Sequence, residues 1–104
     1  MQYNFEWDPS KAKENLRKHK VSFERASQVF LDPNMVSIED EEHSEEEDRW
    51  ITLGMDKNGV LLVVHHTFRE VDPDNYNIRL ISARKPTRRE AKQYHTSDYH
   101  EKGI

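Results

Sequence analysis

The chain has 104 residues, no cysteine and a formal net charge of −4. This length fits one domain, and the missing cysteine excludes disulfide frameworks, thiolate zinc sites and cysteine nucleophiles. Hydrophobic residues make up 34% against 35% charged ones, and the longest apolar run (residues 60–64) is far shorter than the roughly 20 residues of a membrane span, so we expect a small soluble domain in the cytoplasm.

The first half of the chain predicts one strand and two helices. Aromatic and polar residues alternate over residues 4–7, which is typical of a short strand. Asp8 has the features of a helix N-cap, with a proline directly after it, and predicts a helix over residues 9–18. Ser22 can cap a second helix, whose apolar residues recur at helical spacing until the Asp-Pro pair at residues 32–33 ends it.

The second half predicts a sheet and a final helix. Alternating apolar residues predict four strands, over residues 35–39, 49–55, 60–69 and 76–84. The Asn-Gly pair at residues 58–59 is a strong hairpin signal, and residues 72–75 form the next loop. A T-x-x-E capping box at residues 87–90 begins the last helix, which we expect to fray beyond His95.

Together these elements predict an α+β fold. It has an antiparallel meander sheet of about four strands, with two N-terminal helices and one C-terminal helix. We expect a single domain over residues 1–95 and a frayed tail over residues 96–104. These patterns give a fold class and no activity.

The charged residues are unevenly placed. Residues 39–48 contain eight acids and no Lys or Arg, whereas residues 79–92 contain six basic residues and one acid. The basic stretch is either a phosphate-binding surface or a solvated face. The acidic stretch is either an exposed loop or a mask over the basic surface.

One face of the predicted strand 60–69 carries residues suited to phosphate chemistry. Its odd positions share a face that ends in His65, Thr67 and Arg69. Histidine can move a proton near neutral pH, and arginine can hold an anionic phosphorane through paired N–H donors. The alternative is a solvated strand end, with His66 on the opposite face as a packed core histidine.

The next predicted strand carries two more arginines. Regular pleating places Arg79 on one face with Ile81 and Ala83, where it needs either a ligand or a salt bridge to an acid. Arg84 ends the strand beside the last helix, so Arg84, Arg88 and the helix N-terminus form a candidate phosphate pocket. Arg79 has an odd residue number and Arg84 an even one, so regular pleating places them on opposite faces. They can line one site only if the strand leaves the ideal pleat.

Metal binding is not predicted. The chain has six histidines, but His65 and His66 are adjacent and therefore point apart. A dedicated metal site requires a histidine pair at i, i+4 spacing or a tight cluster of ligands, and the sequence has neither. We therefore expect no metal and no cofactor.

Three segments together closely resemble the BrnT toxins, which are the ribonucleases of type II toxin–antitoxin modules. They are FEWDPSKAKENLRKHKVSFERASQVFLDP (residues 5–33), HSEEEDRWITLG (43–54) and IRLISARKPTRREAKQY (78–94). The WDP, KH-VSF, HS-E-R and ISAR-TRRE signatures have the order and spacing of that family. The resemblance implies a RelE-like fold, metal-independent RNA cleavage, slowed translation and growth arrest.

The same resemblance implies a partner. This would be a cognate BrnA-like antitoxin with a ribbon-helix-helix domain, in a complex of two toxins with two antitoxins. The toxin would contact DNA only through that antitoxin, and its substrate would be RNA. A non-catalytic RNA- or protein-binding module and a metal-dependent hydrolase stay open as alternatives.

The resemblance also implies site residues on the later strands and at the start of the last helix. They are Thr67, Arg69, Arg79, Arg84, Arg88 and Glu90, with Lys11 and His19 as weaker candidates for RNA binding. RNA supplies its own nucleophile, the 2′-hydroxyl, so the protein must hold the phosphate and move protons. Our hypothesis is that Arg69, Arg79 and Arg84 hold the scissile phosphate. His65 is the candidate acid or base, and Glu90 is the alternative base.

Overall fold

The computed structural model describes residues 2–43 and 48–103. Its elements, in chain order, are β1 (Gln2–Glu6), α1 (Pro9–His19), α2 (Phe23–Gln28), the short 3-10 helix η1 (Val29–Leu31), β2 (Val36–Glu39), η2 (Glu41–His43), β3 (Arg49–Met55), β4 (Leu61–Asp72), β5 (Asn75–Arg84) and α3 (Arg88–Gly103). The predicted α+β class is confirmed. The sheet is mixed, and its strand order is β1-β5-β4-β3-β2.

The sheet differs from the predicted four-strand meander in its first strand. β2 to β5 pair antiparallel in chain order, as predicted, but β1 joins them by pairing in parallel with β5. The register runs from Gln2 opposite Asn75 to Glu6 opposite Arg79. This pairing joins opposite ends of the chain, so no local pattern of alternation could have predicted it.

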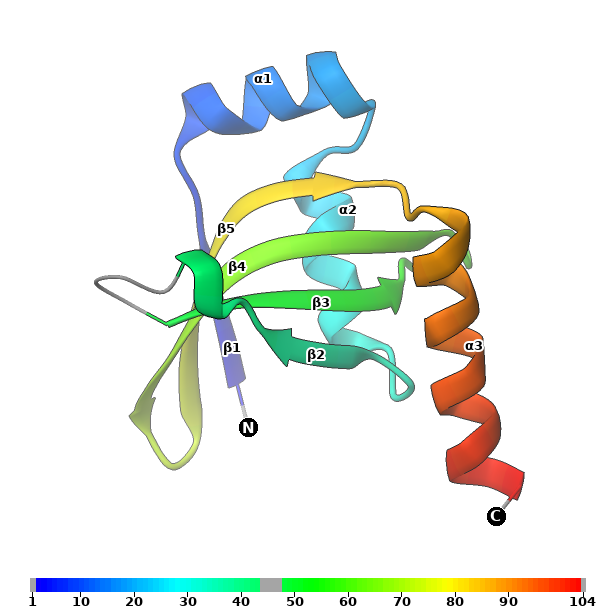
Figure 1. The fold of residues 1–104 in the computed structure, drawn as a ribbon. Helices are drawn as coiled ribbons and strands as arrows, with labels where there is room; N and C mark the ends of the chain where they lie inside the picture. Colours follow the sequence, from blue (N-terminus) through cyan, green and yellow to red (C-terminus); the bar gives the residue numbers. More distant parts are fainter. Residues whose placement is uncertain (1, 44–47, 104) are drawn as a thin grey trace.

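The two N-terminal helices form where the caps predict them. The Asp8 carboxylate accepts a hydrogen bond from Ser10 N at 2.8 Å, and the Ser22 hydroxyl accepts one from Arg25 N at 3.2 Å. In Figure 1, α2 lies behind the sheet and α1 lies beyond β5. Within the described ranges, no helix is both long enough and apolar enough to span a membrane.

The main core fills the space between α2, η1 and one face of the sheet. Its buried residues are Val21, Phe23, Ala26, Val29, Phe30, Leu62, Val64, Ile78, Leu80 and Ala83. On the opposite face, Tyr94 of α3 packs on Leu53 and Val63, and its hydroxyl donates to Asp32 at 2.6 Å. α3 packs on this opposite face at one end, and polar strand residues occupy the other end.

The turn between β3 and β4 sets the register of the site. Asp56 N donates to Val60 O at 2.9 Å, which leaves a three-residue loop, 57–59, in which Gly59 takes the left-handed conformation at φ 78°. A type I turn followed by a left-handed glycine is a common three-residue hairpin connection. It places Arg49 directly opposite Thr67. A two-residue turn at 58–59 would instead place Arg49 opposite Phe68.

One further segment is more regular than the sequence indicates. The predicted loop 72–75 is a tight turn, because β4 continues to Asp72 and β5 begins at Asn75. The Asp72 carboxylate accepts hydrogen bonds from Asp74 N and Asn75 Nδ2, both at 2.9 Å, which stabilises this turn. α3 runs from Arg88 to Gly103, and the expected fraying of the tail over residues 96–104 stays a prediction.

Candidate functional site

A bulge in β5 decides which side chains share the open face of the sheet. His65 of β4 pairs with Ser82, but the next residue, His66, pairs with Leu80. Ile81 is therefore the extra residue on β5. Because successive side chains of a strand alternate between its two faces, one extra residue reverses the alternation for the rest of the strand.

This bulge places Arg79 and Arg84 on the same face. Arg79 pairs with Thr67, and Arg84 pairs with Val63, so both lie with the odd-numbered residues of β4. The prediction that Arg79 shares a face with Ala83 is wrong, because Ala83 lies in the main core on the other side of the sheet. Although Arg79 has an odd residue number and Arg84 an even one, the bulge places both side chains on the same face of the sheet.

Two arginines flank Thr67 across the strands. Arg79 pairs with Thr67 from β5, Arg49 pairs with it from β3, and Glu6 of β1 pairs with Arg79. The Cβ atoms of directly paired residues in antiparallel strands lie about 4.5–5.5 Å apart. Thr67 is only 7% exposed. The pairing thus places two arginine residues beside Thr67, and guanidinium groups are suited to binding an anion.

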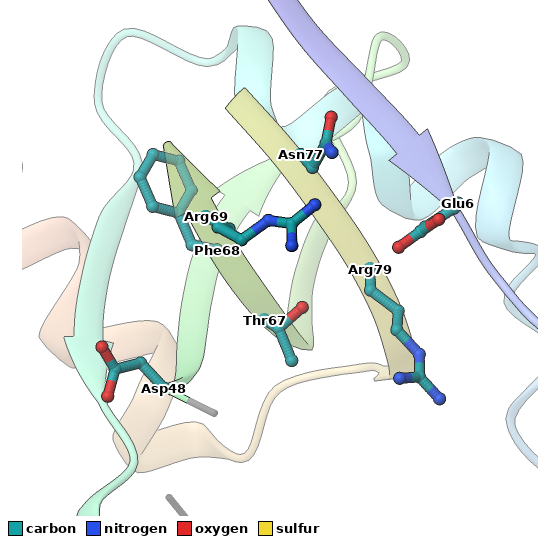
Figure 2. Close-up of a pocket in the computed structure, with 7 residues that line it drawn as sticks. All are labelled: Glu6, Asp48, Thr67, Phe68, Arg69, Asn77 and Arg79. Atoms are coloured by element: carbon teal, nitrogen blue, oxygen red, sulfur yellow. The ribbon is translucent and has the colours of Figure 1, made fainter. Parts of the chain in front are cut away.

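A cavity of about 230 Å³ lies over this part of the open face, and we call it the phosphate cavity. Its lining residues are Glu6, Asp48, Thr67, Phe68, Arg69, Asn77 and Arg79. Figure 2 shows Arg69 extending from β4 over β5, with the Arg79 side chain leaving β5 in another direction. Two cationic side chains at one small cavity can hold a phosphodiester, and the Thr67 hydroxyl and the Asn77 amide add hydrogen-bonding groups.

A second hollow lies one pleat away, at His65. Its volume is about 270 Å³, and its lining residues are Asp40, Arg49, Trp50, His65, His66, Ile81 and Ser82. His65 precedes Thr67 by two residues on the same face, which is about 7 Å along a strand. Its side chain is only partly buried. An accessible imidazole can transfer a proton near neutral pH when it reaches hydrogen-bond distance of the reacting oxygen.

Arg84 and Glu90 lie apart from the phosphate cavity and pair with each other. The two Nη atoms of Arg84 donate to the two carboxylate oxygens of Glu90 at 2.8 and 2.9 Å. Val63, the partner of Arg84, lies four residues before Thr67 on β4, or about 13 Å along the strand. The structure thus brings Arg69 and Arg79 together and leaves Arg84 in an ion pair at the start of α3.

The Glu90 carboxylate also completes the predicted capping box. It accepts a hydrogen bond from Thr87 N at 2.8 Å, and the Thr87 hydroxyl accepts one from Glu90 N at 3.2 Å. The hydrogen bond from Arg84 is the main cause that lowers the pKa of Glu90 to about 2. A carboxylate with so low a pKa is a weak base at neutral pH. This favours His65 over Glu90 for proton transfer.

The other candidate residues lie outside both hollows. Lys11 and His19 are exposed on α1, and Arg88 is exposed in the first turn of α3. Any role of Lys11, His19 and Arg88 would therefore concern parts of a bound nucleic acid that lie away from the two hollows.

In the part of the chain that the structure describes, no group of three His, Cys, Asp or Glu side chains could hold a metal ion.

The sequence interpretation missed Arg49, Glu6 and Asn77. Arg49 is the first residue of a correctly predicted strand, and it belongs to the HS-E-R signature, but its partner depends on the register of the hairpin. Glu6 and Asn77 reach the site through the pairing of β1 with β5 and through the bulge. Only the signature at Arg49 was a signal in the sequence.

His66 is a packed core histidine, which is the alternative that the sequence analysis gave for it. It is 2% exposed, and its Nδ1–H donates to the carbonyl oxygen of Thr67 at 3.0 Å. Its Nε2 lies 2.7 Å from the hydroxyl of Thr52, which lies 2.7 Å from the hydroxyl of Ser37. Burial is the main cause that lowers the pKa of His66 to about 4, so the ring is neutral at pH 7.

This buried ring predicts a pH-dependent stability. Unfolded His66 takes up a proton near its ordinary pKa of 6.5, and the folded residue does so only near 4. The contribution of His66 to the free energy of unfolding is therefore fully present above pH 6.5 and is lost as the pH falls toward 4. We expect the free energy of unfolding to be about 2 kcal/mol lower at pH 5 than at pH 7. Urea unfolding at the two pH values measures this difference, and it should shrink by most of that amount in His66→Gln. A variant with the full difference would contradict the assignment.

Comparison with known families gives one match. Residues 7–90 match the sequence profile of a family described as the ribonuclease toxin, BrnT, of type II toxin–antitoxin systems. No curated protein sequence matches the chain. The matched residues include all the lining residues of the phosphate cavity except Glu6.

Proposed function

Because the chain belongs to the BrnT family of ribonuclease toxins of type II toxin–antitoxin systems, we propose that it cleaves RNA at the phosphate cavity. The observation that carries this proposal is the row in which Arg49 and Arg79 flank Thr67, with Arg69 at the same cavity. These side chains offer fixed hydrogen-bond donors to the phosphate that gains charge during cleavage.

The proposed reaction uses the 2′-hydroxyl of RNA as its nucleophile. The 2′-oxygen attacks the phosphorus and gives up its proton, while the bond from phosphorus to the 5′-oxygen breaks and that oxygen receives a proton. The products are a 2′,3′-cyclic phosphate and a 5′-hydroxyl. Arg69 and Arg79 hold the non-bridging oxygens, and His65 transfers one of the two protons. The reaction needs no metal ion.

The structure supports a smaller role for Arg84 and Glu90 than for the residues at the cavity. Their mutual ion pair joins the end of β5 to the start of α3. We propose that this pair acts by positioning β5 and the helix N-terminus. The scissile phosphate itself would then lie with Arg69, Arg79 and Thr67.

Incubation of the purified protein with RNA and a chelator tests this function. We expect fragments with 2′,3′-cyclic phosphate ends, and we expect DNA of the same sequence to stay intact because it has no 2′-hydroxyl. A binding module would retard RNA on a gel without producing such ends. A metal-dependent hydrolase would lose its activity in the chelator. Either result would overturn the proposed mechanism.

The family implies an antitoxin partner, and we propose how that partner inhibits. A BrnA-like antitoxin with a ribbon-helix-helix domain would cover the arginines of the open face with acidic and apolar residues, in a complex of two toxins with two antitoxins. DNA would be contacted only through the antitoxin. Without it, RNA cleavage in the cytoplasm would slow translation and arrest growth.

A further inference from the structure

A third cavity lies on the opposite face of the sheet, and we call it the aromatic cavity. Its volume is about 210 Å³, and its lining residues are Tyr3, Phe30, Met35, Ser37, Trp50, His66 and Phe68. This is smaller than the roughly 300–1,000 Å³ of sites for drug-sized ligands. Because aromatic rings supply most of its wall, the cavity suits one planar ring system.

Phe68 lines both the aromatic cavity and the phosphate cavity. The residue before it, Thr67, is the last residue of β4 that pairs with β3. Beyond Thr67, no residue of the described ranges 2–43 and 48–103 pairs with the β3 side of β4. A flexible chain whose phosphate lies at Thr67 can therefore pass around this side of β4 and place its next group against the other face.

The Phe68 ring is oriented for stacking. It stacks on Tyr76, with ring centroids 5.1 Å apart and an angle of 22° between the planes. Phe68 is still 37% exposed, so part of the residue is accessible. Each nucleobase has a flat π-face, and proteins that bind single-stranded RNA commonly stack such bases on aromatic side chains.

We propose that the aromatic cavity binds the RNA base next to the phosphodiester held at Thr67 and Arg79. This inference rests on the proposed ribonuclease function and adds a base-binding subsite to it. Phe68 and Trp50 supply the stacking surfaces. The cavity thereby selects the position at which the strand is cut.

A chain of hydrogen bonds behind the cavity gives this subsite a preference. A carbonyl oxygen only accepts, so the neutral His66 ring donates through Nδ1 to Thr67 O and accepts at Nε2. The Thr52 hydroxyl must then donate to Nε2, and the Ser37 hydroxyl must donate to Thr52. Ser37 is left with lone pairs at the cavity. It therefore accepts a hydrogen bond from a base amino group, which favours cytosine over uracil.

Binding of non-cleavable RNA tests the subsite. The probes are short oligoribonucleotides with 2′-O-methyl groups, each with a single abasic position. Trp50 fluorescence in a Trp7→Phe background reports binding at the cavity. We expect one abasic position to weaken binding by about 5- to 150-fold, which is the range for loss of one stacked base. At that position, cytosine should bind more tightly than uracil.

Variants at the cavity identify the residues that act. Phe68→Ala should bind the oligoribonucleotide more weakly by the same factor, and an abasic position should not weaken its binding further. Phe68→Tyr keeps the ring and should bind as the unchanged protein does. Ser37→Ala should abolish the difference between cytosine and uracil. Val71→Ala, an exposed residue farther along β4, is the matched control and should bind normally.

The outcomes separate this subsite from the ribonuclease function. If RNA is cut, but no abasic position matters and Phe68→Ala binds normally, the subsite is wrong and the ribonuclease function stands. If the Phe68 variants keep their fold by circular dichroism and Phe68→Tyr fails like Phe68→Ala, the stacking role is overturned. A protein that neither binds nor cuts RNA overturns both proposals.

Discussion

Replacement of Arg79 by alanine should slow RNA cleavage by about 100- to 1,000-fold, which is the usual effect of removing one preorganised donor from a transition state. Arg79 lies beside Thr67 across the strands and lines the phosphate cavity together with Arg69. Its side chain is exposed on the open face, so its loss should leave the core intact. The measurement is the single-turnover rate of formation of 2′,3′-cyclic ends, and cells that make the variant alone should grow.

Two matched variants show whether charge or geometry matters at Arg79. Arg79→Lys keeps the charge but loses the planar fork that binds two oxygens at once, so it should restore only part of the rate. Arg17→Ala removes an arginine that pairs with Glu14 on the surface of α1, and it should cleave RNA normally. Full activity in Arg79→Ala would remove Arg79 from the mechanism.

Replacement of Asn15 by alanine should lower the free energy of unfolding by about 3 kcal/mol. Asn15 is 5% exposed, and its Nδ2 donates to Val21 O at 2.9 Å and to Ala83 O at 2.8 Å. Its Oδ1 accepts from Ala83 N at 3.0 Å. Alanine would leave these three buried backbone groups without that partner, and each such loss costs about 1–3 kcal/mol before relaxation.

Urea unfolding of the two proteins measures the effect of Asn15, through the midpoint at an unchanged slope. Glu14→Ala is the control, because Glu14 is the exposed neighbour on the same helix and should change the free energy by less than about 0.5 kcal/mol. Equal midpoints for Asn15→Ala and the unchanged protein would show that water replaces the lost amide. The hydrogen bonds of Asn15 would then not be needed to hold α1 on β5.

The elements that depend on short-range contacts could be predicted from the amino-acid sequence. Asp8 and Ser22 cap their helices as predicted, and the capping box at residues 87–90 forms. The strand over residues 49–55 has the predicted bounds. In each case the deciding interaction joins residues a few positions apart. Propensity and spacing along the chain therefore carry the information.

The way in which the site residues come together could not be predicted from the sequence. The pairing of β1 with β5 brings Glu6 to Arg79, and the bulge at Ile81 reverses the side-chain alternation so that Arg79 and Arg84 share a face. The register of the β3–β4 hairpin places Arg49 beside Thr67. These facts follow from contacts between distant segments. In a sheet, a shift of one residue moves a side chain to the other face, so a local pattern cannot fix which polar groups meet.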